Sequence, residues 1–161
     1  GVSYSTKTIT GNVGIPMINL ASFSPDGSYK VTGIKTYTGE CPQDKILSPY
    51  DLVMCNTQQT AIDFSKDIIG KSMLVPDIFN GNITSSHHVN TIKVQTENLK
   101  FYLNHLFNTN SFHAYIANFA CGTNIMGLDF SGVEDFYIAV PNKSILDKFS
   151  NITSNIERKK A

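Results

Sequence analysis

The chain has 161 residues, of which 41% are hydrophobic and 16% are charged, and its formal net charge is zero. This composition excludes a disordered chain and allows one sizeable hydrophobic core. No apolar stretch approaches the roughly 20 residues that cross a bilayer, and the N-terminus lacks the charged-then-apolar layout of a secretory signal. We therefore expect a soluble, cytoplasmic protein, and the ends at Gly1 and Ala161 suggest a fragment of a longer chain.

The first half of the chain has the pattern of short strands separated by turns. Alternating or continuous apolar residues bounded by Gly, Pro or Asn predict strands at residues 4–9, 17–23, 52–55, 73–75 and 88–94. The segment from Ser24 to Ser28 predicts a turn, because Pro25 fixes one backbone dihedral angle and Gly27 accepts a positive one. We expect these strands to form a twisted, mostly antiparallel sheet.

The second half of the chain has helical periodicity. Thr96 is a suitable N-cap for a helix over residues 97–107, where apolar residues recur at i, i+3, i+4 and i+7. The same spacing from Phe112 to Phe119, with Ser111 before it and Gly122 as a helix stop, predicts a second helix. Residues 136–140 then predict a late strand that Pro141 closes.

A third helix is expected to follow, with Ser144 as its cap. Its apolar residues recur at the 4-3-4 spacing of a coiled-coil seam; they are Ile145, Phe149, Ile152 and Ile156. Such a seam would leave an exposed apolar stripe that favours self-association, whereas the alternative is that the stripe packs on the domain's own core. The fold class is therefore α/β (α+β), with two packed amphipathic helices and the start of a C-terminal spacer helix.

Patterns typical of catalysis or metal binding are incomplete in this chain. Lys71 and Ser72 end a segment like a phosphate-binding loop, but Ser65 stands where the first glycine is needed. His87 and His88 on a strand would point to opposite faces and would not share a metal. The three cysteines have neither C-x-x-C spacing nor a histidine pattern, which predicts buried free thiols; they are Cys41, Cys55 and Cys121. We expect no cofactor and no metal.

Several motifs follow one another in a specific order along the chain. They are Gly14-Ile-Pro-Met-Ile18, the segment from Ile46 to Thr57, Ala120 to Leu128, Phe136 to Pro141, and the helix from Ile145. In order and spacing these motifs resemble a target recognition domain of the specificity (S) subunit of type I restriction-modification systems. The pattern departs from the family at Pro49 and Tyr50, where a glycine usually precedes the aspartate.

The resemblance implies a DNA reader that is not itself an enzyme. Residues 1–143 would form the recognition domain, and residues 144–161 would begin the spacer helix that pairs with a second recognition domain or another copy. Partner methyltransferase (M) and restriction (R) subunits would hold the S-adenosylmethionine, ATP and nuclease chemistry. Three alternatives stay open: the specificity region of a fused type IIG enzyme, a small cytoplasmic hydrolase that uses Cys121 and His113, and a generic protein-interaction module.

Polar loops supply the side chains that would read double-stranded DNA. Asn and Gln amides suit adenine in the major groove, the Thr methyl suits thymine, and lysines suit phosphates. The candidate contacts are Lys35, Tyr37, Asn56, Thr57, Gln58, Gln59, Thr60, Lys66, Lys71, Ser86, His87, Thr123 and Asn124. A net charge of zero opposes tight binding, so the lysines are expected to gather on the face that holds residues 56–60. The alternative for each side chain is an ordinary polar surface.

Overall fold

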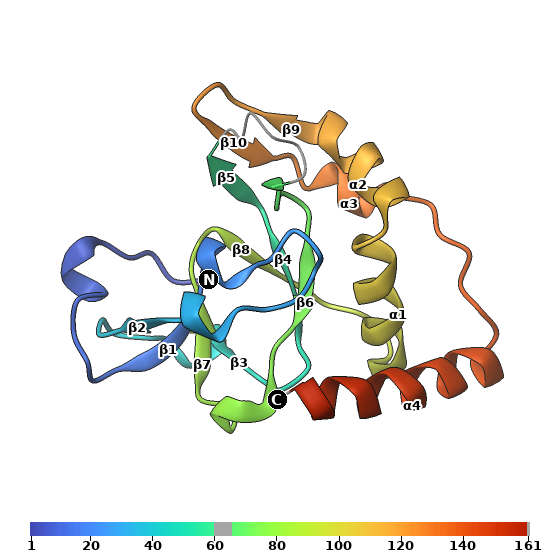
Figure 1. The fold of residues 1–161 in the computed structure, drawn as a ribbon, viewed down its shortest axis with the longest axis horizontal. Coiled ribbons are helices and arrows are strands. Elements are labelled where there is room, and N and C mark those ends of the chain that lie inside the picture. The colour runs from blue at the N-terminus through green and yellow to red at the C-terminus, as the bar shows by residue number, and fades with distance from the viewer. Residues whose placement is uncertain (60–65, 161) are drawn as a thin grey trace.

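The part of the chain that the structure, a computed structural model, describes comprises residues 1–59 and 66–160 and contains ten β-strands and four α-helices (Figure 1). The strands are β1 (Ile15–Ile18), β2 (Lys35–Tyr37), β3 (Ile46–Leu47), β4 (Leu52–Cys55), β5 (Thr57–Gln59), β6 (Ser72–Leu74), β7 (Ile83–Ser85), β8 (Val89–Ile92), β9 (Ala120–Cys121) and β10 (Ile125–Leu128). The helices are α1 (Glu97–Phe107), α2 (Asn110–Ile116), α3 (Ser131–Glu134) and α4 (Lys143–Lys160).

The strands form three small sheets rather than one. Their strand orders are β2-β1-β7-β3, β6-β4-β8 and β5-β10-β9. Among the described strands, every pairing within these sheets is antiparallel except that of β1 with β7. The predicted mixed class with mostly antiparallel strands is therefore confirmed.

The central strand β4 is buried on both faces. All four of its residues have no exposed surface. Val53 and Cys55 face a core that includes residues of β1, β6 and β7. Leu52 and Met54 face a second core built largely on α1 and α2. Because successive residues of a strand point to opposite faces, two-sided burial requires the uninterrupted apolar run that this strand has.

Helix α1 has the bounds that the periodicity predicts, and polar contacts fix its position against β6. Thr96 takes the N-cap position, although its side chain makes no capping hydrogen bond. Ser72 Oγ donates to Asn104 Oδ1 at 3.0 Å, and the Ser72 carbonyl oxygen accepts from Asn108 Nδ2 at 3.0 Å. These buried polar groups are paired with one another, so α1 keeps one register against the sheet.

The second predicted helix begins earlier and ends sooner than its pattern indicates. Thr109 caps it instead of Ser111, because Thr109 Oγ1 accepts from the Phe112 amide at 3.2 Å. Gly122 is not a helix stop but lies at the end of the β9–β10 hairpin with φ of +138°. A β-carbon at this position would lie 2.0 Å from the Ile125 carbonyl oxygen, so the close approach of the two strands requires glycine.

Three of the strand predictions are wrong in whole or in part. Residues 6–8 form a 3-10 turn in which the Ser5 amide donates to Thr8 Oγ1 at 2.9 Å. β1 ends at Ile18 because the Asn19 side chain accepts from the Ala21 amide at 2.9 Å and starts another such turn. Residues 136–140 follow an extended course between α3 and α4 (Figure 1), but no strand of the described chain pairs with them, and the late strand is β10.

Helix α4 packs along α1, and Asn142 rather than Ser144 caps it. Asn142 Oδ1 accepts from the Ile145 amide at 3.0 Å. Ser150 Oγ donates to Asn98 Oδ1 at 3.0 Å, and Asn98 Nδ2 donates to Asp147 Oδ1 at 2.7 Å. Like the other described helices, α4 lacks the length and apolar character of a membrane-spanning segment.

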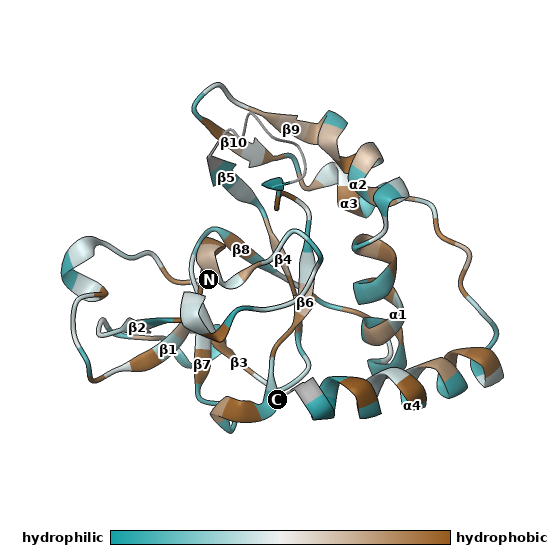
Figure 2. Cartoon of the chain, viewed as in Figure 1, coloured by the Kyte–Doolittle hydropathy of each residue, from teal (hydrophilic) through white to brown (hydrophobic). Residues whose placement is uncertain are grey.

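Three of the four apolar residues in the predicted α4 stripe face outward. Ile145, Ile152 and Ile156 are 56%, 63% and 48% exposed, and Figure 2 shows brown hydrophobic bands along this helix. The contact with α1 uses the buried Leu146 and its polar neighbours, together with the fourth stripe residue, Phe149, whose ring contacts those of Tyr102 and His105. The alternative in which the stripe packs on the domain's own core therefore holds for Phe149 and is wrong for the three isoleucines.

Truncation of the central strand should unfold the domain more readily than truncation of the exposed stripe. We expect Leu52→Ala to lower the free energy of unfolding by about 2–5 kcal/mol, because it leaves a cavity in a buried core. Ile152→Ala should change it by less than about 0.5 kcal/mol. Urea titration followed by circular dichroism measures both, and equal losses in the two variants would contradict the assigned burial.

Candidate functional site

A polar network at the end of β4 joins segments that are far apart in the sequence. Asn56 Nδ2 donates to Asn90 Oδ1 at 2.6 Å and to the His87 carbonyl oxygen at 3.2 Å. Thr57 Oγ1 donates to Asn56 Oδ1 at 2.7 Å, and the Asn56 amide donates to the His88 carbonyl oxygen at 3.0 Å. Asn56 therefore fixes the positions of its neighbours, all of which are partly or fully exposed.

Three aromatic rings extend this network across the surface. The ring centroids of His87 and His88 are 3.9 Å apart, and that of Tyr4 is 5.5 Å from His87. The two histidines lie in the turn before β8 and not on a strand, so the prediction that they point to opposite faces is wrong. We call the six residues of the network and the rings the polar patch; they are Tyr4, Asn56, Thr57, His87, His88 and Asn90.

The polar patch contains no lysine, arginine or carboxylate side chain. Partial burial, and then the neighbouring His87, lower the pKa of His88. No group of three or more potential metal ligands occurs among the described residues. The patch is therefore suited to hydrogen bonding and ring contacts rather than to metal binding or strong attraction of phosphate.

The β9–β10 hairpin is joined to the same network. The Leu128 amide donates to the Asn56 carbonyl oxygen at 2.8 Å. β10 pairs with β5 in a register that places Gly127 opposite Thr57 and Ile125 opposite Gln59. The exposed Thr123 and Asn124 form the hairpin tip beyond this ladder, about 10 Å from Thr57 at roughly 3.4 Å per residue. The structure thus connects two predicted groups, Asn56–Thr57–His87 and Thr123–Asn124.

Four of the predicted DNA contacts are corrected, because their side chains are buried. Gln58 is 4% exposed, and its Oε1 accepts from the Ile68 and Ile69 amides at 2.7 Å and 3.1 Å. Tyr37 packs in a small core with Val2 and Met17. The remaining two buried residues are Lys71 and Ser86. A side chain held inside the fold in this way has no surface to offer to a base or a phosphate.

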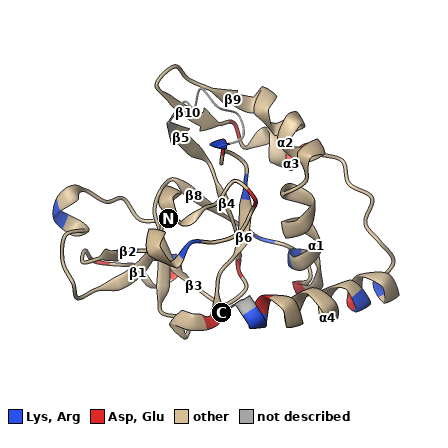
Figure 3. Ribbon diagram, in the orientation of Figure 1, with Lys and Arg blue, Asp and Glu red and all other residues tan. Residues whose placement is uncertain are grey.

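Of the remaining predicted contacts, Lys35 lies away from the polar patch. Lys35 is exposed, but it lies on β2, in a different sheet from the strands around Asn56. Lys66 is also exposed. The side chain of Gln59 and the whole of Thr60 lie outside the described part of the chain. Figure 3 shows the described Lys and Arg residues spread from the N-terminal turns to α4. The prediction of a lysine-rich face around residues 56–60 is therefore wrong.

A cluster of buried ionisable side chains lies beneath α2. His113 Nε2 is 3.7 Å from Asp67 Oδ2, and both residues are buried, as is Lys71. Burial, and then the charge of Lys71, lower the pKa of His113. Asp67 Oδ1 also accepts from the Ile69 amide at 2.9 Å. This cluster links α2 to the chain before β6, and it was not foreseen because its members are distant in sequence.

The cysteines differ in exposure, which corrects the prediction that all are buried. Cys55 is buried, Cys41 is intermediate and Cys121 is exposed, and all three are free thiols. Burial raises the pKa of Cys55 to about 12, which makes it a poor nucleophile at neutral pH. Cys121 lies exposed on β9, whereas His113 faces the buried Asp67. This arrangement offers no support for the alternative of a Cys–His hydrolase.

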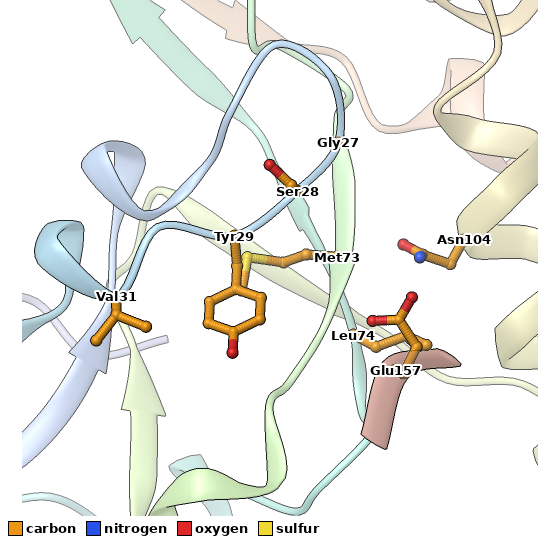
Figure 4. A pocket seen from close by; sticks show the side chains of 8 residues that line it. All are labelled: Gly27, Ser28, Tyr29, Val31, Met73, Leu74, Asn104 and Glu157. Atoms are coloured by element: carbon orange, nitrogen blue, oxygen red, sulfur yellow. The ribbon is translucent and has the colours of Figure 1, made fainter. Parts of the chain in front are cut away.

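A separate pocket of about 430 Å³ lies between the predicted turn at residues 24–28, β6, α1 and α4. The turn is present as predicted, with a hydrogen bond of 2.9 Å from the Gly27 amide to the Ser24 carbonyl oxygen. Figure 4 shows the Asn104 amide and the Glu157 carboxylate on one side of the pocket and the Tyr29 ring on the other. Among the residues that the structure describes, no predicted DNA contact lines this pocket.

No protein-family model matches this chain, and no curated protein matches it in sequence. A functional interpretation therefore rests on the residues and on their geometry.

The two histidines with lowered pKa values should make the fold less stable in mild acid. In the unfolded chain both side chains take up protons near pH 6.5, whereas the folded protein resists their protonation. Stability from this source is fully present above pH 6.5 and is lost as the pH falls from there towards the lowered pKa values.

Unfolding in urea at pH 7.5 and pH 5.5 measures this effect. The loss of stability on acidification should be smaller in His113→Gln and His88→Gln than in the unmodified chain. His105→Gln is the control, because that residue is exposed on α1. An identical pH dependence in all four proteins would contradict this account.

Proposed function

We propose that the chain is a DNA-recognition domain without catalytic chemistry of its own, of the kind found in type I restriction-modification specificity subunits. The observation that carries this proposal is the fixed network around Asn56, which joins exposed hydrogen-bonding groups to the β9–β10 hairpin. Groups held in place before binding lose less conformational freedom when they contact a ligand. The order of sequence motifs supports the same proposal independently.

The hairpin provides a means of entering a groove of DNA. The major groove of duplex DNA admits a two-stranded β-ribbon as well as a helix. The span of about 10 Å from Thr57 to the hairpin tip matches about three base-pair steps of 3.4 Å. Thr123 and Asn124 would contact base edges or phosphates at the tip, while Asn90, Thr57 and His87 contact the flanking backbone.

Weak affinity is an integral part of this proposal. The chain has as many acidic as basic residues, so neutralisation of phosphates contributes little. In the proposed role, methyltransferase and restriction subunits add their own contacts with the duplex and carry out the chemistry on it. The domain then reads one half of a two-part target in the cytoplasm. The specificity region of a fused type IIG enzyme would use the same surface.

Substitution at the hairpin tip should alter DNA recognition without unfolding the domain. Selection of a random pool of DNA duplexes on the unmodified domain at low salt should enrich a preferred sequence. The Asn124→Ala variant should bind that sequence about 5- to 150-fold more weakly than the unmodified domain does. The matched control is Asn151→Ala, because Asn151 is an exposed asparagine on α4. Fluorescence anisotropy at several salt concentrations should give a shallow slope, roughly −2 to −4. Absence of any enriched sequence, or of binding at low salt, would refute the proposal.

The outward stripe of α4 supports pairing with another copy or with a second recognition domain. Sedimentation velocity at high protein concentration should show self-association of the unmodified chain, since three exposed isoleucines lie along one helix. Ile152→Lys should shift the protein to monomer, whereas Asn151→Lys, which adds the same charge beside the stripe, should not. A strictly monomeric unmodified chain would remove the support for pairing through α4.

A further inference from the structure

Two hollows lie along the outer edge of β8 and share part of their lining. The first has a volume of about 600 Å³ and the second about 520 Å³. Both are lined by Thr91, Lys93, Phe130 and Glu134. Because they share these four residues, the two hollows are adjacent, and we call them together the β8 groove.

The backbone of Thr91 faces this groove with unpaired hydrogen-bonding groups. β8 is at the edge of its sheet and pairs on its inner side with β4. The Asn56 amide bonds to the His88 carbonyl oxygen, and hydrogen-bonded pairs alternate along an antiparallel ladder. The backbone N–H and C=O groups of Asn90 and Ile92 are therefore directed to β4, and those of Thr91 are directed away from it. Within the described residues, no strand pairs with this outer edge.

The two walls of the β8 groove differ in chemistry. One wall is apolar and comes from α1, α3 and the extended segment 136–140; its residues include Leu99, Leu103, Phe107, Val133, Phe136 and Ile138. The other wall is more polar and includes Asp44, Lys45 and Asn90. A strand placed along β8 would present alternate side chains to these walls. Such a strand must therefore alternate between apolar and polar residues.

The chain does not fill this edge with its own late segment. Residues 136–140 have the sequence pattern of a strand and are extended, but they form part of the groove wall instead of pairing with β8. Tyr102 Oη donates to the Ala139 carbonyl oxygen at 2.9 Å and holds this segment against α1. The groove between the wall and the edge of β8 thus stays open.

We propose that the β8 groove binds an extended peptide segment of a partner protein, which adds as a strand to the outer edge of β8. Main-chain hydrogen bonds at Thr91 provide affinity, and the alternating walls provide specificity. Lys93 and Glu134 have opposite charges and line both hollows, so the segment carries an acidic residue near Lys93 and a basic residue near Glu134. A lysine at a sheet edge disfavours direct pairing of two copies, which favours a different protein as the occupant.

The probe is a pool of fluorescein-labelled octapeptides in which apolar residues alternate with polar ones that include one Glu and one Lys. The apolar positions vary among Val, Ile, Leu and Phe. We expect binding at micromolar to millimolar concentration by anisotropy, with a change in the amide resonance of Thr91. Methylation of alternate backbone nitrogens of the selected peptide should abolish binding, because it removes the donors that a new strand needs. A scrambled peptide with adjacent apolar residues should not bind.

Two substitutions in the groove separate its chemistry from general effects on folding. Lys93→Glu should weaken binding of the selected peptide about fivefold and favour a peptide with its Glu and Lys exchanged. Val133→Asp should weaken both peptides, because it places a charge in the apolar wall. Both residues lie outside the polar patch, so DNA recognition is tested separately and should persist in both variants.

Three outcomes would overturn the proposal. Equal binding of the backbone-methylated peptide would mean that no strand is added. If no peptide in the pool binds, and the chain self-associates in a way that Lys93→Glu alters, the β8 groove would be assigned to a second copy of the chain. A change in the chemical shift of the Thr91 amide on addition of duplex DNA, without a change on addition of peptides, would assign the β8 groove to nucleic acid.

Discussion

The burial of β4 on both faces is the constraint on which the rest of the structure depends. Its four residues belong alternately to the two main cores, so a change in the register of this strand would disturb both at once. β6 and β8 take their positions from β4 by antiparallel pairing. The site follows from the same strand, because Asn56 is the residue at which the chain leaves the interior and reaches the surface.

The chain beyond β4 shows how strand geometry separates structural amides from exposed ones. In β5, Thr57 is partly exposed, while the side chain of its neighbour Gln58 points inward and accepts hydrogen bonds from two backbone amides. A buried amide that replaces water in this way contributes to stability and is not free to contact a ligand. Asn56, in contrast, holds surface residues in place, because it donates hydrogen bonds to Asn90 and to the backbone of both histidines.

The surfaces that the fold leaves uncovered are as informative as its cores. The α4 stripe is apolar and largely exposed, which suits another helix, whereas the β8 groove combines an apolar wall with an open strand edge, which suits an extended peptide. The polar patch has neither property and offers hydrogen bonds and rings. Together these three surfaces are consistent with a domain that acts within a larger assembly.

The sequence by itself determined the fold class, the bounds of α1 and β4, and the apolar stripe of α4, because each of these depends on residue periodicity within one segment. Only the tertiary structure decided that Gln58, Tyr37, Lys71 and Ser86 are buried and that Asn56 lies beside His87 and Asn90. Among the described strands, it also left residues 136–140 without a partner, although their pattern is that of a strand. Exposure and pairing depend on which distant segments pack together, and alternation within a segment does not specify them.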